Sequence, residues 1–167
     1  MSSNKGFTLI ELVTVIIILA ILGAFTIPRL RDLSSKASDS HFKYVMGSFK
    51  SAVNLANMKW AVEGRPATIV VNGITIQMTA TGYPNNTTNS NHIPLTAAQH
   101  ANRPSIRLWY ALLVQAPRIT AQTPQSGWLG SAYTGTPADN LDFSYYKGST
   151  YWRFRYNRQT GQVIQTH

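Results

Sequence analysis

The sequence has no cysteine and few acidic residues. Its 167 residues include six Asp and Glu against 15 Lys and Arg, a formal net charge of +9. Without cysteine the chain forms no disulfide, thiolate nucleophile, Cys-ligated zinc site or iron–sulfur cluster. The shortage of acids excludes an acidic tail and is compatible with an anionic partner. Charged residues make up 13% of the chain, well below the ~25% of soluble domains, so either the surface is polar and uncharged or the hydrophobic residues are concentrated in one segment.

An apolar run of membrane length lies near the N-terminus. Residues 7–27 contain a single charged residue, Glu11. As a helix this run is about 31 Å long, which matches the bilayer core. A secretory signal has a shorter apolar stretch followed by a small-residue cleavage site, whereas Ile27-Pro28-Arg29 follows here. The rest of the chain is barely large enough to enclose a buried helix of this length. The run therefore predicts a membrane-spanning helix.

The residues at the start of the run form a recognisable motif. Lys5 and Gly6 are followed by Phe7-Thr8-Leu9-Ile10-Glu11 and then by the apolar segment up to Pro28. This order resembles the type IV prepilin signature, in which a short basic leader ends in Gly and Phe-Thr-Leu-Ile-Glu opens an apolar helix. The resemblance is residue for residue over Gly6 to Glu11.

The resemblance implies a processing junction and an assembly residue. Residues 1–6 would be a leader that a prepilin peptidase removes by cleaving after Gly6, and the new amino terminus of Phe7 would be methylated. Residues 7–28 would cross the inner membrane and later form the filament core. A carboxylate in a membrane costs on the order of 3 kcal/mol, and Glu11 would be paired with the Phe7 ammonium of a neighbouring subunit. The alternative is that Glu11 merely lies at the level of the lipid headgroups.

The remaining segments predict a helix that continues into a β-rich head. Residues 29–63 carry apolar side chains at steps of three and four, which predicts an amphipathic continuation of the helix beyond Pro28. Residues 64–167 would form the globular head. The resemblance implies an α+β protein with the type IV pilin fold, in which the long N-terminal helix packs against an antiparallel β-sheet.

Within the head, the pattern predicts two hairpins and one short helix. Asn72-Gly73 between two β-rich runs predicts a type I′ turn. Alternating residues predict a second hairpin, with Trp152, Phe154 and Tyr156 on one face and Arg153 and Arg155 on the other. The predicted elements are hairpins over 68–78 and 151–165, a helix over 104–114, and irregular stretches over 83–91 and 120–140.

Few side chains suggest a binding site. Asp139 and Asp142 are weak candidates for calcium because carboxylate oxygens suit that ion. His92 and His100 are eight positions apart and have no acid nearby, which disfavours a metal site. Three arginines after the last acid are candidates for anion binding: Arg153, Arg155 and Arg158. No motif for catalysis or for a cofactor is found, so we expect neither an enzyme nor a bound cofactor.

The expected function is that of a structural pilus subunit for adhesion or pilus biogenesis. A second resemblance, to minor pilins of the mannose-sensitive haemagglutinin (MSHA) type, rests on Leu108-Trp109-Tyr110-Ala111-Leu112-Leu113 and the last hairpin, and it implies a minor pilin. The expected partners are the prepilin peptidase, other pilin subunits and an inner-membrane assembly platform. The protein would span the inner membrane once, with its head in the periplasm, and then enter the extracellular pilus. The alternatives are a pseudopilin of a type II secretion system and a DNA- or surface-binding tip subunit.

Overall fold

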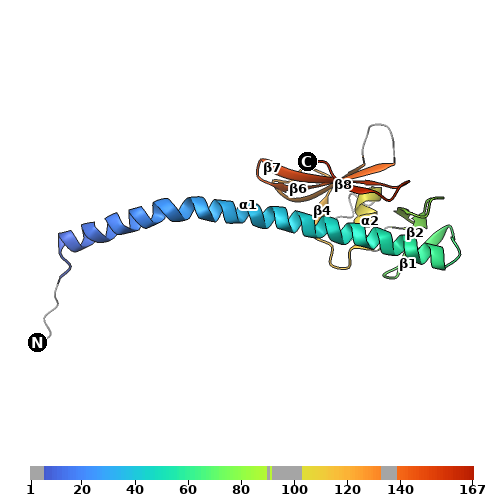
Figure 1. Cartoon of the computed structure of the whole chain (residues 1–167), viewed down its shortest axis with the longest axis horizontal. Coiled ribbons are helices and arrows are strands. Elements are labelled where there is room, and N and C mark those ends of the chain that lie inside the picture. Colours follow the sequence, from blue (N-terminus) through green and yellow to red (C-terminus); the bar gives the residue numbers. More distant parts are fainter. Residues whose placement is uncertain (1–5, 90, 92–102, 133–138) are drawn as a thin grey trace, which may run out of the picture. The chain divides into compact units, whose positions relative to one another are not determined.

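The longest element is one helix that includes both predicted helical segments. The computed structural model describes residues 6–89, 91, 103–132 and 139–167. Helix α1 (Leu9–Val62) is continuous and contains Pro28 (Figure 1). The helix therefore passes through the proline, as the resumed periodicity predicted. By its internal contacts the chain divides into two compact units, Met1–Ser40 and His41–His167.

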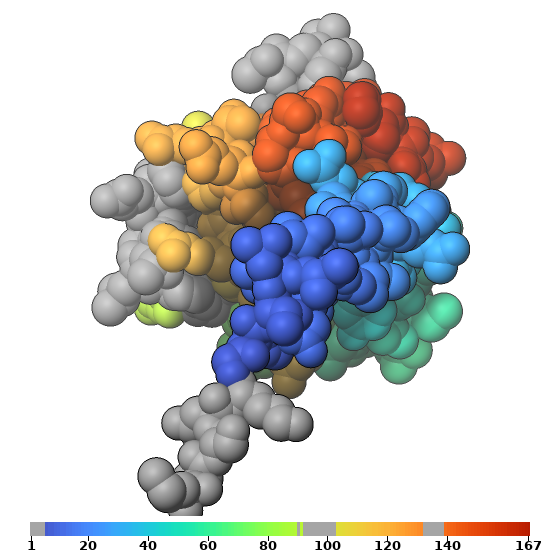
Figure 2. Space-filling view, turned by 90° about the vertical axis from the view of Figure 1, so that its left-hand side faces the viewer, coloured from blue at the N-terminus to red at the C-terminus, as the bar shows by residue number. Residues whose placement is uncertain are grey.

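The first unit exposes its apolar side chains. The most apolar 18-residue window of α1 contains no buried residue, and by length and composition this helix could cross a membrane. The space-filling view shows its blue side chains at the surface (Figure 2). Leu30 and Leu33, which belong to the predicted apolar stripe, are also exposed. In the described part of the chain, no other helix meets the length and composition of a membrane span.

The second unit has an aromatic core built on the C-terminal part of α1. Phe42, Val45, Phe49, Val53 and Ala56 are buried, and their spacing of three and four places them on one helical face. The ring of Phe49 lies 4.9 Å from that of Phe143 and 5.6 Å from that of Tyr156. From Phe42 onward, this confirms the predicted amphipathic face of the helix.

A small antiparallel sheet follows the helix. It consists of β1 (Thr68–Val71), β2 (Ile74–Met78) and β3 (Pro84–Thr87), in that order. Asn72 and Gly73 have φ angles of 52° and 77°, which confirms the predicted type I′ turn. The prediction of an irregular stretch over 83–91 was wrong for β3, because tertiary pairing of Thr87 with Ile76 overrides the low strand propensity of Pro and Asn.

Helix α2 (Pro104–Leu112) lies between the two sheets in sequence and has Pro in its first turn, as predicted. Ile106, Leu108 and Trp109 are fully buried. The indole N–H of Trp109 donates to the carbonyl of Pro117 at 2.7 Å. This bond fixes the chain where it leaves the helix.

A five-stranded sheet covers the helix face (Figure 1). Its order is β4-β5-β6-β7-β8, antiparallel except for the parallel pair β4–β5. The predicted C-terminal hairpin is confirmed as β7–β8. The irregular stretch predicted over 120–140 was wrong for Ser126–Ala132, which form β5 and pair with β6, and residues 133–138 of that stretch lie outside the described residues. The strands are β4 (Ile119–Thr120), β5 (Ser126–Ala132), β6 (Asn140–Lys147), β7 (Thr150–Asn157) and β8 (Val163–Gln165).

Candidate processing and assembly site

The first turn of α1 is closed by reciprocal bonds between Thr8 and Glu11. A Glu11 carboxylate oxygen accepts from the Thr8 backbone N–H at 2.9 Å and from the Thr8 hydroxyl at 2.8 Å. The Glu11 backbone N–H donates back to the Thr8 hydroxyl oxygen at 3.4 Å. This is a capping box, in which the N-cap side chain and the third helical residue satisfy each other's backbone donors. The negative charge also lies at the positive end of the helix dipole.

The predicted cleavage junction lies directly before this capping box. Gly6 and Phe7 are exposed and precede the first helical residue, Leu9. No atom lies within 4 Å of the position where a Cβ would stand on Gly6. The bond between Gly6 and Phe7 is therefore open to another protein, while the Glu11 carboxylate is held two helical residues beyond the start of α1. Lys5 lies outside the described residues.

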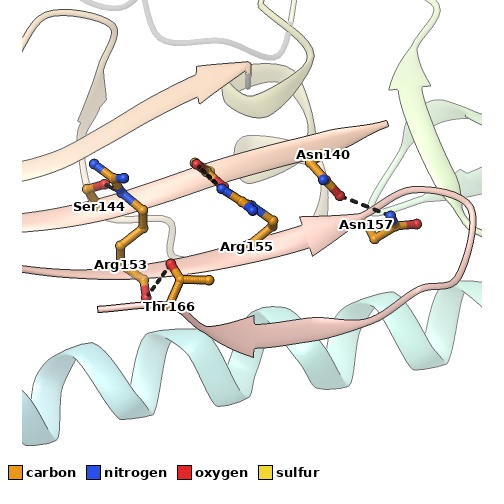
Figure 3. Close-up of polar contacts among 7 residues, drawn as sticks. Asn140, Ser144, Arg153, Arg155, Asn157 and Thr166 are labelled. Atoms are coloured by element: carbon orange, nitrogen blue, oxygen red, sulfur yellow. Dashed lines mark hydrogen bonds and ion pairs between the residues drawn. The ribbon is translucent and has the colours of Figure 1, made fainter. Parts of the chain in front are cut away.

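Two of the candidate anion-binding arginines are engaged on strand β7. Arg155 donates to both carboxylate oxygens of Asp142, at 2.7 Å and 3.0 Å, and Arg153 donates to the Ser144 hydroxyl at 3.0 Å (Figure 3). The Asp142 side chain is only 5% exposed. Both oxygens that would bind calcium are thus used by one guanidinium, and the positive charge of Arg155 is balanced.

The third arginine points elsewhere. Arg158 donates to the Asn85 side-chain oxygen at 2.7 Å and to the Asp139 carbonyl at 3.4 Å. It lies in the turn after β7, so the structure brings Arg153 and Arg155 to one face and does not bring Arg158 to them. Asp139 accepts from the Gln159 amide at 3.3 Å. Within the described ranges no three His, Asp or Glu side chains form a metal-binding group, and His92 and His100 lie outside them.

The N-terminal segment matches known proteins. Residues 1–27 match the family described as "Prokaryotic N-terminal methylation motif". The chain is 47% identical over 53 residues to fimbrial protein EcpB of Eikenella corrodens. This alignment covers 32% of this chain and 33% of that protein. It is 40% identical over 55 residues to the type IV narrow pilus major component PilA5 of Thermus thermophilus, covering 33% and 47%. The N-terminal third of the chain is therefore similar to type IV pilins and fimbrial proteins.

The similarity of the chain to these relatives is partial. A third relative, the type IV major alpha-pilin of Moraxella bovis, is 41% identical over 56 residues, which is 34% of this chain and 35% of that protein. The chain thus spans between a third and a half of the length of these curated relatives. No solved structure matches it.

Two residues that matter in this structure had no role in the sequence-based prediction. Thr8 is part of the motif, and its spacing of three from Glu11 is the signal that would have identified the capping box. Tyr156 is fully buried and donates its hydroxyl to the Pro84 carbonyl at 2.8 Å. Burial raises the pKa of the Tyr156 phenol, because the charged form is disfavoured away from water. No sequence signal links Tyr156 to Pro84, since 72 positions separate them.

Proposed function

We propose that this chain is a structural subunit of a type IV pilus that assembles through its N-terminal helix. The supporting observation is the combination, within residues 1–27, of the methylation motif and an exposed apolar helix that opens with a glutamate-containing capping box. A prepilin peptidase cleaves after Gly6 and Phe7 is methylated. The subunit first crosses the inner membrane once through residues 7–28, with its head in the periplasm, and is then transferred through an assembly platform into the extracellular pilus.

Glu11 is the residue that sets the register between subunits. In the free subunit its carboxylate is satisfied by Thr8, so the charge does not require a second chain. During assembly a terminal ammonium of Phe7 from a neighbouring subunit approaches the same carboxylate. A close pair of opposite charges is strongly favoured where water is scarce, and an unpaired charge there is penalised. Only the register that brings the two charges together is then stable.

The role within the pilus is proposed to be that of a minor pilin. This part rests on the resemblance of residues 108–113 and the last hairpin to MSHA-type minor pilins, whereas two of the relatives above are named as major components. A pilus is favoured over a secretion pseudopilus because the three relatives are named as pilus or fimbrial proteins. Quantitative mass spectrometry of sheared filaments tests the minor role, and this chain should be far less abundant than the main subunit.

The test of the assembly role separates membrane insertion from filament incorporation. Glu11→Ala, expressed in cells that lack the native gene, should reach the membrane fraction at normal levels and be absent from sheared filaments. The matched control is Glu63→Ala. Glu63 is an acid that directly follows the C-terminal end of α1, and it forms an exposed pair with Lys59 at 2.8 Å. Normal incorporation of Glu11→Ala would refute the pairing of Glu11 with Phe7.

A further inference from the structure

The large sheet has a polar and aromatic face opposite its core face. We call this the outer face and define it by the side chains of β6, β7 and the C-terminal segment that alternate with buried residues such as Phe143 and Phe154. Paired positions across the strands form four rows on this face, and Figure 3 shows members of the rows that contain Asn140, Arg155 and Arg153. The rows are Asn140/Asn157/Gln162, Asp142/Arg155/Ile164, Ser144/Arg153/Thr166 and Tyr146/Tyr151/His167.

A pocket of about 230 Å³ lies at one end of the outer face, lined by Asn140, Arg155, Asn157, Gln162 and Ile164. Asn140 is only 7% exposed. Its side-chain oxygen accepts from the Asn157 amide at 2.9 Å, whereas its own Nδ2 group donates to no partner among the residues that the structure describes. The Asn140 amide belongs to the pocket lining, so its Nδ2 group offers donors to a molecule in the pocket.

The pocket is polar but electrically balanced. Arg155 is paired through two hydrogen bonds with Asp142, so guanidinium and carboxylate neutralise each other beside the pocket. The remaining polar groups of the lining are the amides of Asn140, Asn157 and Gln162, which both donate and accept hydrogen bonds. The side chain of Ile164, which is 45% exposed, adds an apolar surface to the lining. Such a lining suits a small, uncharged molecule that has several hydroxyl groups and one apolar face.

Aromatic rings lie at the opposite end of the outer face. The ring of Tyr151 lies 5.3 Å from that of Tyr146 and 4.2 Å from that of His167. The Arg153 guanidinium lies 5.2 Å from the Tyr151 ring. At about 3.3 Å per strand residue, roughly 20 Å separate Asn157 from Tyr151 along β7. An extended ligand could therefore contact the pocket and the aromatic row at once.

We propose that the outer face binds a neutral oligosaccharide, with one hexopyranose ring in the Asn140 pocket and further rings directed toward Tyr151. The hydroxyl groups of a sugar match the amides, and its apolar face packs on Ile164. A nucleic acid is less well matched, because Arg155 is neutralised by Asp142 and Arg153 is engaged with Ser144. This inference goes beyond the proposed assembly role and does not depend on it, since binding is measured on unassembled subunits.

The test uses the full chain in a polyoxyethylene detergent, whose headgroup contains no sugar. Saturation-transfer NMR screens neutral tetrasaccharides of glucose, galactose, mannose and N-acetylglucosamine, together with a glucuronate-containing tetrasaccharide and single-stranded oligo-dT. Calorimetry then measures the affinity of the best neutral binder. Asn140→Asp retains the acceptor for Asn157 but removes the unpartnered donors, and it should weaken binding at least tenfold.

A second pair of variants guards against a loss of folding. Ile164→Ser removes the apolar wall at an exposed position and should weaken binding about fivefold, a loss consistent with part of one apolar side-chain contact. Val70→Ser is the matched control, because Val70 is a similarly exposed β-branched residue on β1 and its replacement should leave affinity unchanged. Saturable binding of a neutral tetrasaccharide with these losses supports the proposal. It is overturned by binding of only the acidic tetrasaccharide or oligo-dT, by the absence of binding, or by equal affinities of the Ile164 and Val70 variants.

Discussion

Helix α1 exposes its apolar side chains in the first unit and buries one apolar face in the second. Ile16 and Leu33 are 54% and 63% exposed, whereas Phe42 and Phe49 are fully buried. All four belong to helix α1, so helix propensity does not explain the difference. The difference lies in what covers the helix. In residues 41–62 the strands and α2 cover one face of the helix, whereas no residue in the most apolar window of the helix is buried.

This contrast separates two uses of hydrophobic surface. In the second unit, burial of the aromatic core stabilises the fold of the single chain. In the first unit the same free energy becomes available only when the exposed helix is covered. Substitutions in the first unit should therefore alter processing and assembly, and substitutions in the second should alter the free energy of unfolding. All four tryptophans lie after residue 41, so their fluorescence reports on the second unit alone.

The largest effect is expected at the processing junction. Gly6→Leu should abolish cleavage, so that intact-mass spectrometry finds a chain heavier by residues 1–6 and sheared filaments contain none of it. Gly23→Leu is the matched control, because no atom lies within 4 Å of a Cβ on Gly23 either, and it should be cleaved normally. Efficient cleavage of the Gly6 variant would mean that the junction lies elsewhere.

The core contacts should give the largest effect on stability. Phe49→Ala removes a fully buried ring that contacts Trp109, Phe143, Phe154 and Tyr156. We expect a loss of about 3–5 kcal/mol in the free energy of unfolding, measured by tryptophan fluorescence in denaturant. Leu33→Ala, at an exposed position of the same helix, should change the value by less than about 0.5 kcal/mol. Equal losses in both variants would contradict the contrast between the units.

The ion pair on the outer face should give an intermediate effect. Arg155→Ala leaves the buried Asp142 carboxylate without its guanidinium, and removal of one partner of a buried pair costs about 3 kcal/mol. Lys59→Ala disrupts an exposed i,i+4 pair with Glu63 and should cost no more than about 0.5 kcal/mol. In a double-mutant cycle with Asp142→Asn, the coupling to Arg155 should be most of the single-mutant loss. A coupling near zero would show that the buried pair does not stabilise the fold.

The smallest effect is expected at the capping box. Thr8→Ala removes the side-chain acceptor of the N-cap and should destabilise the first turn of α1 by about 1 kcal/mol, seen as faster amide hydrogen exchange at Leu9 to Leu12. Thr8→Ser retains the hydroxyl and should exchange like the native chain. Fluorescence-detected unfolding of the second unit should be the same in both variants. A change in that transition would show that the two units are energetically coupled.

The sequence predicted the elements whose signals are local. The type I′ turn at Asn72-Gly73, the proline at the start of α2 and the apolar face from Phe42 to Ala56 each depend on residues close together in the chain. Strands β3 and β5 were missed because Pro84, Asn85, Gly127 and Gly130 have low strand propensity, and pairing with distant strands decides their structure. The Asp142–Arg155 pair was missed for the same reason, since it needs the register of β6 against β7.

The prediction for the N-terminal site depended on a motif and could not extend to its geometry. Gly6, Phe7 and Glu11 were identified by their order, and their roles in processing and assembly remain predictions. The structure adds that Thr8 donates hydrogen bonds to the Glu11 carboxylate within the single chain, which the motif alone does not describe. For the outer face, the alternation of β7 predicted that Arg153 and Arg155 share a side, whereas the partners that neutralise or engage them come from β6.

The bond from Tyr156 to Pro84 has a consequence for the order of folding. It joins the last strands of the chain to the small sheet formed by much earlier residues, and the apolar face of α1 is covered by rings from the same late strands, Phe143 and Phe154. Contacts between such distant residues form slowly because a long loop must close first. During synthesis from the N-terminus the helix is complete before its cover exists. The head therefore reaches its native packing only after its final strands have been synthesised and, in the proposed location, have crossed the membrane.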